Sequence, residues 1–165
     1  MARSLITPDQ DAVISEIEIA APAERVFRAL TDPDQLARWF HSASCPVKSW
    51  KMDARLGGSY SYSQATSTLT INGVREFKCH GEILEFDPPR LMAYTWIGNW
   101  HLEAEKETLV RWELTPVANG TRVKVTHSGL VQDPVSRKDY SGGWPGVVEK
   151  LKEFVEHTFL ADRKD

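Results

Sequence analysis

Residues 143–159 read GWPGVVEKLKEFVEHTF, and their spacing predicts the most regular helix in the chain. Apolar residues recur at steps of three and four positions: Trp144, Val147, Val148, Leu151, Phe154, Val155 and Phe159. Glutamate and lysine residues occupy the opposite side. An apolar face this wide is stable only when it is buried against another layer of secondary structure. The stretch therefore predicts a long C-terminal helix that lies on a β-sheet.

The region between Cys45 and His127 supplies that sheet. Strands are predicted at residues 47–52, 58–64, 74–86, 91–97, 108–115 and 121–127. The pairs Asn72-Gly73 and Asn119-Gly120 are typical of hairpin turns, so consecutive strands should pair antiparallel. Gly81 falls inside a long strand and predicts a bulge or bend that lets the sheet curl.

The N-terminal part of the chain adds one strand and two short helices. Residues 13–19 (VISEIEI) alternate as a half-buried strand does. Pro22 fits the first position of a helix, and Asp32-Pro33 fits the cap and first position of a second helix. The order predicts an α+β fold, and a curved sheet around one helix leaves a natural place for a pocket between them.

Composition limits the function further. The 165 residues, 41% of them hydrophobic, suit one domain over 1–165 with a core at about 13–159. A net charge of −3 offers no basic face for nucleic acid. No apolar run approaches the roughly 20 residues of a membrane span, which favours a soluble, cytoplasmic protein. Cys45 and Cys79 and the five histidines lack metal-ligand spacing, so neither a metal nor a cofactor is predicted.

Several blocks of sequence resemble one superfamily. They are APAERVF at 21–27, LARWF at 36–40, GEILEFDPPRL at 81–91, GTRVKVTH at 120–127 and the Gly143-Trp144 pair. Together they resemble the START-like or SRPBCC superfamily, in the branch named after the C-terminal domain of the activator of the heat-shock protein 90 ATPase. The resemblance implies a helix-grip fold, in which a curved antiparallel sheet wraps around a long C-terminal helix.

The candidate ligand-binding residues are predicted to lie on the apolar, inward-facing sides of their strands and helices: Trp39, Tyr60, Phe77, Trp96, Trp112, His127, Trp144, Val148 and Leu151. The aromatic members would give a cavity large rigid walls with polar edges. His127 follows Val123 and Val125 at two-residue steps, so it should face the same interior and could bond to a ligand. Each aromatic residue, taken singly, fits ordinary core packing as well.

Three functions are compatible with these residues. The leading hypothesis is binding of a small hydrophobic or aromatic molecule between the sheet and the C-terminal helix. The resemblance also implies an alternative, a module that binds a chaperone or another protein. A second alternative is a cyclase, lyase or hydrolase that uses His127. A histidine that acts as a base needs a carboxylate to orient it. Glu113 is the neighbouring carboxylate, but alternation along its strand predicts that it points away from the interior. We therefore predict no catalytic residues.

Overall fold

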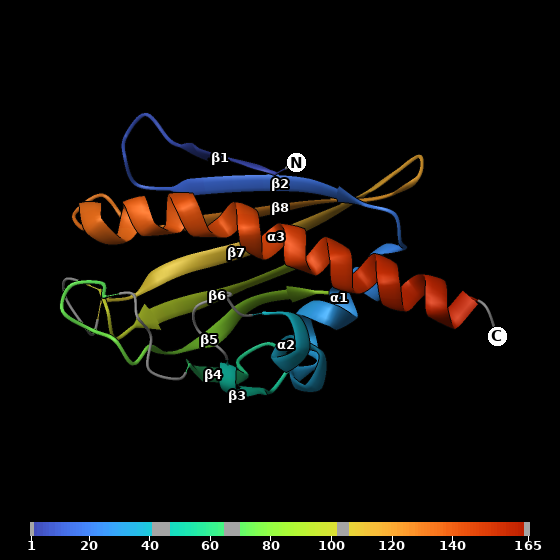
Figure 1. Cartoon of the computed structure of the whole chain (residues 1–165), viewed down its shortest axis with the longest axis horizontal. Helices are drawn as coiled ribbons and strands as arrows, with labels where there is room; N and C mark the ends of the chain where they lie inside the picture. Colours follow the sequence, from blue (N-terminus) through green and yellow to red (C-terminus); the bar gives the residue numbers. More distant parts are fainter. Residues whose placement is uncertain (1, 41–46, 65–69, 102–105, 164–165) are drawn as a thin grey trace.

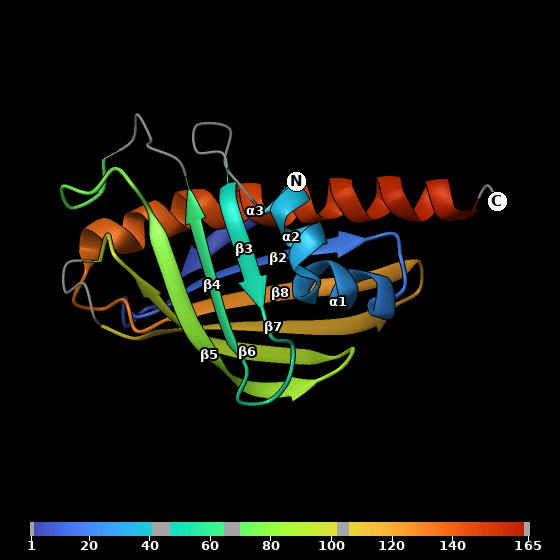
Figure 2. The same ribbon diagram turned by 90° about the horizontal axis from the view of Figure 1, so that it is seen from below.

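The computed structural model describes residues 2–40, 47–64, 70–101 and 106–163. An eight-stranded antiparallel sheet curves around the helix α3, which lies along its concave face (Figures 1 and 2). The strands are β1 (Arg3–Ile6), β2 (Val13–Ile19), β3 (Val47–Met52), β4 (Ser59–Gln64), β5 (Lys78–Asp87), β6 (Leu91–Gly98), β7 (Thr108–Val117) and β8 (Gly120–Ser128). The helices are α1 (Ala23–Thr31), α2 (Pro33–Trp39) and α3 (Pro134–Arg163).

The strand order is β1-β2-β8-β7-β6-β5-β4-β3, which confirms the predicted antiparallel meander from β3 to β8. β2 pairs with β8, with Val13 opposite His127, so the first predicted strand lies beside the last. β1 was not predicted; it extends the sheet by pairing with β2, with Arg3 opposite Glu16. The predicted α+β helix-grip fold is confirmed.

The strand predicted at 74–86 begins later, at Lys78. Asn72 and Gly73 form a tight turn with φ values of 50° and 83°, and the residues on either side of it, Ile71 and Val74, bond to each other. Because this turn makes its own two-residue bridge, the main ladder with β6 starts only after it. The predicted Asn-Gly turn is confirmed, whereas the strand boundary was wrong by four positions.

Gly81 serves a close approach between strands rather than the bulge. The register shift in β5 lies between Ile83 and Glu85. A Cβ at position 81 would stand 1.9 Å from the Thr95 carbonyl oxygen and 2.7 Å from the Tyr60 ring. The Tyr60 hydroxyl donates to the same Thr95 oxygen at 2.6 Å. Because glycine has no Cβ, the Tyr60 ring can pass over position 81 of β5 and reach the Thr95 carbonyl of β6.

The two short helices form where they were predicted. Pro22 stands as the N-cap of α1, one position earlier than expected. The Asp32 carboxylate accepts the Asp34 backbone N–H at 3.0 Å, which caps α2 as predicted. The Trp39 indole donates to the Ala29 carbonyl at 2.8 Å and ties α2 to α1. None of the helices in the described ranges is long and apolar enough to cross a membrane.

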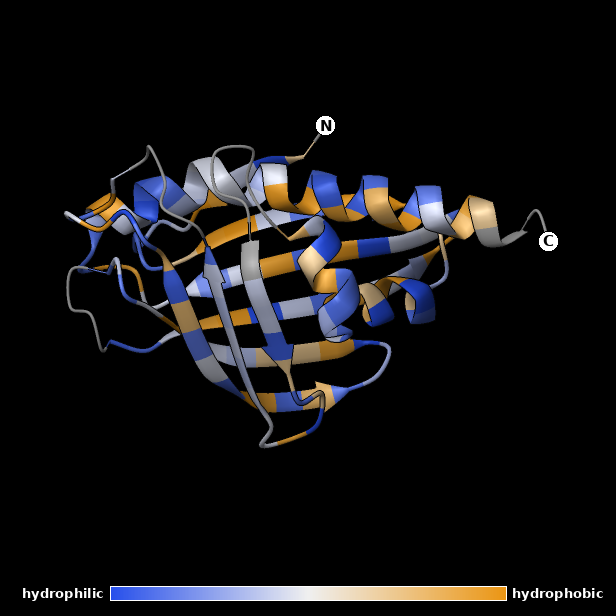
Figure 3. Cartoon of the chain, turned by 60° about the horizontal axis from the view of Figure 1, so that its bottom comes forward, coloured by the Kyte–Doolittle hydropathy of each residue, from blue (hydrophilic) through white to orange (hydrophobic). Residues whose placement is uncertain are grey.

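α3 begins at Pro134, so the helix start predicted at Gly143 was wrong. Asp133 caps the helix by accepting the Ser136 backbone N–H at 3.1 Å. Pro145 has no N–H for the Ser141 carbonyl, but the Ser4 hydroxyl of β1 donates to that carbonyl at 2.5 Å. The helix therefore continues through its proline, and its hydrophobic residues turn toward the sheet (Figure 3).

Candidate ligand-binding interior

The space beneath α3 holds one contiguous group of aromatic rings, here called the ring cluster. Its members come from the C-cap of α2 and from β3, β4, β6, β7 and α3: Phe40, Trp50, Tyr60, Tyr62, Tyr94, Trp96, Trp112 and Trp144. Trp96 lies at its centre, with ring centroids 5.5 Å from Tyr62 and 6.2 Å from Trp144. The rings contact one another, so side chains fill this space in the present conformation.

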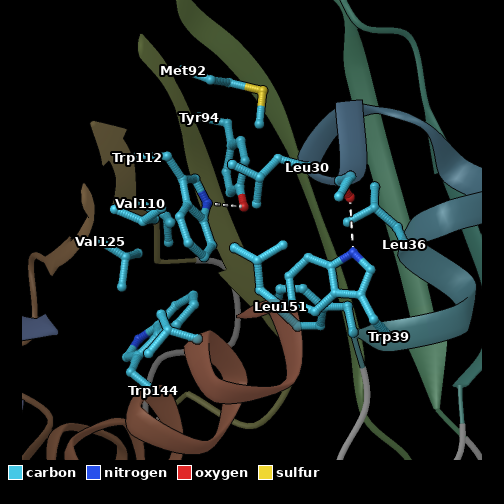
Figure 4. Close-up of a cluster of buried hydrophobic side chains, with 14 of the residues drawn as sticks. Leu30, Leu36, Trp39, Met92, Tyr94, Val110, Trp112, Val125, Trp144 and Leu151 are labelled. Carbon is cyan, nitrogen blue, oxygen red and sulfur yellow. Dashed lines mark hydrogen bonds between the residues drawn. The ribbon is translucent and has the colours of Figure 1, made fainter. Parts of the chain in front are cut away.

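All nine residues predicted to line the site are buried, each at most 3% exposed. Trp112 and Trp144 meet edge to face at 5.7 Å, and the Trp112 indole donates to the Tyr94 hydroxyl at 2.9 Å (Figure 4). Val148 and Leu151 lie on the sheet-facing side of α3 and are fully buried. As ligand contacts, all nine stay predictions.

Two of the nine lie at the margin of the ring cluster. Trp39 contacts Phe40 at 5.2 Å, and Phe40 in turn reaches Trp144 at 6.3 Å. Phe77 precedes β5 and packs against Trp100 at 5.3 Å, so it joins the group from one end. The structure therefore brings the nine residues into one interior without placing them all around one point.

Hydrogen bonds fix the tautomer of His127. The Thr108 hydroxyl donates its single proton to the Trp96 carbonyl at 2.6 Å. Its 2.8 Å contact with Nε2 of His127 therefore requires an N–H on Nε2. The Trp144 indole donates to Nδ1 at 3.2 Å, which requires an unprotonated Nδ1. Burial lowers the pKa of His127 well below its ordinary value, so the ring is neutral with both nitrogens engaged.

This arrangement does not suit general-base catalysis. The Nδ1 lone pair of His127 already accepts the Trp144 N–H, and Glu113 pairs with Arg111 at 3.2 Å on the other face of the sheet. Burial raises the pKa of the Cys79 thiol, which suits the predicted role of a small buried hydrophobe, and Cys45 lies outside the described residues. The described ranges contain no group of three metal-ligating side chains.

Sequence reasoning missed His101 and Tyr140. The Tyr140 hydroxyl accepts the Trp96 indole N–H at 3.0 Å and lies 2.7 Å from Nε2 of His101. The Tyr140 ring also packs on His127 at 4.1 Å between centroids. Tyr140 stands four positions before Trp144, so an extension of the helical spacing would have found it. His101 follows a strand end and carries no periodic signal.

Hollows lined by described residues lie near the interior, and two of them are considered for the site. The first, of about 10 Å³, lies next to this polar group and is lined by His101, Lys106, Thr108, Gly129, Leu130, Gln132 and Asp133. Its volume matches one water molecule or one oxygen atom of a ligand. The second, of about 490 Å³, is open to solvent along β3, β4 and β5 and includes Lys51, Ser61 and His80.

Comparisons with known proteins agree with the fold. A family model described as Activator of Hsp90 ATPase homolog 1-like protein matches residues 20–156. No curated protein matches the chain. A solved structure from Rhodobacter sphaeroides is 19% identical, with a TM-score of 0.75 over 98% of this chain and 99% of that one. The AHSA1-like protein from Aeromonas hydrophila is 22% identical, with a TM-score of 0.70 over 90% and 94%. CalU16 from Micromonospora echinospora is 20% identical, with a TM-score of 0.64 over 98% and 87%.

Proposed function

The chain belongs to the Activator of Hsp90 ATPase homolog 1-like family, and we propose that it binds a small apolar or aromatic molecule beneath α3. The observation that carries this proposal is the ring cluster, because it unites sheet, α2 and α3 in one buried aromatic surface. Flat rings stack favourably on an aromatic guest in offset or edge-to-face geometry. A bound aromatic molecule would therefore replace contacts among the protein's own rings with contacts between those rings and the ligand.

A weak segment of α3 supports the entry of such a guest. Gly142, Gly143, Pro145 and Gly146 surround Trp144, and all four lower helix propensity. A Cβ at any of these three glycines would meet nothing within 4 Å, so packing does not require glycine there. What glycine provides at these positions is backbone freedom. Movement of this segment would lift Trp144 from the sheet and uncover the rings below it.

The two alternatives have less support. The family description names an ATPase activator, which motivates a test with a chaperone, but no contact surface in the described residues points to that partner. Catalysis by His127 would require a free ring nitrogen, whereas both of its nitrogens are engaged. Ligand binding is therefore the function that the geometry supports best.

Titration with naphthalene, biphenyl and indole tests the proposal. We expect binding to change tryptophan fluorescence and to raise the melting temperature, with about 2.7 kcal/mol of stabilisation at a hundredfold excess over Kd. Trp144→Phe should weaken binding more than Trp39→Phe, because Trp39 lies at the margin of the ring cluster. If no compound binds and a chaperone middle domain is retained in a pull-down, the interaction-module alternative replaces this proposal.

A further inference from the structure

Two hydrogen-bonded contacts join Ala2 and β1, here called the strap, to α3. The Ser4 hydroxyl donates to the Ser141 carbonyl at 2.5 Å, and the Ala2 backbone N–H donates to Oε1 of Glu149 at 3.1 Å. Because the single Ser4 proton goes to that carbonyl, the 3.2 Å contact between the two serine hydroxyls has Ser141 as its donor. The strap therefore runs along the side of α3 and is fixed to it at two points (Figure 1).

These two contacts lie on either side of the weak segment of α3, residues 142–146. Ser141 immediately precedes the segment, and Glu149 follows it by less than one helical turn. The three glycines of the segment lower its helix propensity, and Pro145 lacks the N–H that would bond to the Ser141 carbonyl. The Ser4 hydroxyl takes the place of that N–H. The stability of the segment therefore depends on a contact from β1.

β1 is held less firmly than the strands at the centre of the sheet. It has four residues, it lies at the edge of the sheet, and it pairs with β2 alone. None of its four side chains is fully buried. Segments with so few buried contacts open locally at a lower free energy than the core does. The strap can therefore separate from α3 while the other strands stay paired.

Trp144 lies inside the weak segment and covers part of the ring cluster. Its ring meets Trp112 at 5.7 Å and Trp96 at 6.2 Å, and its indole donates to Nδ1 of His127 at 3.2 Å. The side chain is 3% exposed, so a ligand that stacks on these rings has to displace it first. Whatever holds residues 142–146 in the helix therefore also holds Trp144 over the rings.

We propose that the strap controls access to the ring cluster. The bond from Ser4 to Ser141 keeps the weak segment closed, and its release lets Trp144 move away from the sheet. This inference rests on the proposed function, because it specifies how the ligand reaches its site. The strap closes over the empty and the occupied interior alike. It therefore sets the rates at which the ligand enters and leaves, and it changes Kd little.

Amide hydrogen exchange tests the strap without a ligand. Ser4→Ala removes the bond to Ser141, so the amides of residues 142–147 should exchange about twofold to tenfold faster, the effect of one net hydrogen bond. Ser4→Thr keeps a hydroxyl and should keep the slow exchange. Thr121→Val is the matched control, because its hydroxyl bonds to the Ala21 carbonyl, near Glu156 in the C-terminal half of α3. It should leave residues 142–147 unchanged. Equal exchange in Ser4→Ala and the unaltered protein would overturn the inference.

A reversible cross-link tests the control of ligand entry. Ser4→Cys combined with Ser141→Cys puts two thiols where the hydroxyl oxygens are 3.2 Å apart, close enough for a disulfide bond. Cys45→Ser removes a competing thiol, and Cys79 is buried. The variants with Ser4→Cys or Ser141→Cys alone cannot form the link and serve as controls.

Biphenyl is the probe, and stopped-flow tryptophan fluorescence measures its rates of binding and release. Oxidation of the double-cysteine variant should slow both rates at least about tenfold, and reduction should restore both, while Kd changes less than about twofold. Oxidation should leave the single-cysteine variants unchanged. Equal rates in the oxidised and reduced double variant would overturn this inference and leave the proposed function standing. If biphenyl binds neither form, the proposed function fails and this inference fails with it.

Discussion

At the scale of single residues, His127 shows how a lone histidine is held neutral in an aromatic interior. It donates from Nε2 to Thr108 and accepts at Nδ1 from Trp144. Each partner leaves a buried polar atom unsatisfied when it is removed, and such an atom destabilises a fold by about 1–3 kcal/mol. The imidazole therefore links β7, β8 and α3 at the point where the helix is weakest.

This linkage predicts coupling between Trp144 and His127. Trp144→Phe should lower the free energy of unfolding by at least about 1 kcal/mol, because Nδ1 of His127 loses its donor. With His127→Leu already present, the same change should be less destabilising, since no orphaned nitrogen remains. Urea unfolding of the two single variants and the double variant measures the difference. Strictly additive effects would show that the 3.2 Å contact contributes nothing.

The two-residue alternation along the strands predicted which side chains are buried, but it did not predict the hydrogen bonds between those side chains. His127, Trp96 and Trp112 were all placed in the interior by two-residue alternation, and all are buried. The bond from Trp144 to His127 joins α3 to β8, and no local pattern specifies such a pair. The contact of Tyr140 with His101 was missed for the same reason, because the two residues meet only through the tertiary fold.

At the scale of elements, α3 combines a C-terminal part of high helix propensity with a segment of low helix propensity at residues 142–146. Gly142, Gly143 and Pro145 resemble a helix stop in the sequence, and this misplaced the beginning of the helix. The compensating contact comes from Ser4 on β1, which is distant in the sequence. Local sequence therefore predicted the elements other than β1 and their order, whereas boundaries that depend on tertiary contacts could not be predicted.

The glycines of the fold should respond in opposite ways to alanine. Gly142→Ala and Gly143→Ala should each stabilise the protein by about 0.5–1 kcal/mol, since their added Cβ atoms meet nothing and alanine favours helix. Gly81→Ala should destabilise it, because the Cβ would collide with the backbone of β6. Denaturant midpoints compare the three variants. Loss of stability at 142 and 143 would mean that these glycines have a structural role in α3.

At the scale of the whole molecule, the fold places its polar groups unevenly. The curved sheet presents an apolar surface to most of α3, while His101, His127, Tyr140 and Asp139 gather toward the start of that helix. Burial lowers the pKa of both histidines, and burial raises the pKa of Asp139 to about 6. These groups tie the stability of the molecule to pH in opposite directions.

The histidines should dominate this dependence. Above about pH 7 they are neutral in both states, but below 6.5 the unfolded chain binds protons that the native state does not. The free energy of unfolding should then fall by at most about 1.4 kcal/mol per pH unit for each histidine. Asp139 opposes this between 3.8 and about 6, where the native carboxyl keeps a proton that the unfolded one has lost. Asp139→Asn should therefore steepen the decline and His127→Leu should flatten it, as urea titrations from pH 7.5 to 5 can measure. If stability does not change with pH in either the unaltered protein or Asp139→Asn, the imidazoles bind protons as readily in the native state as in the unfolded chain.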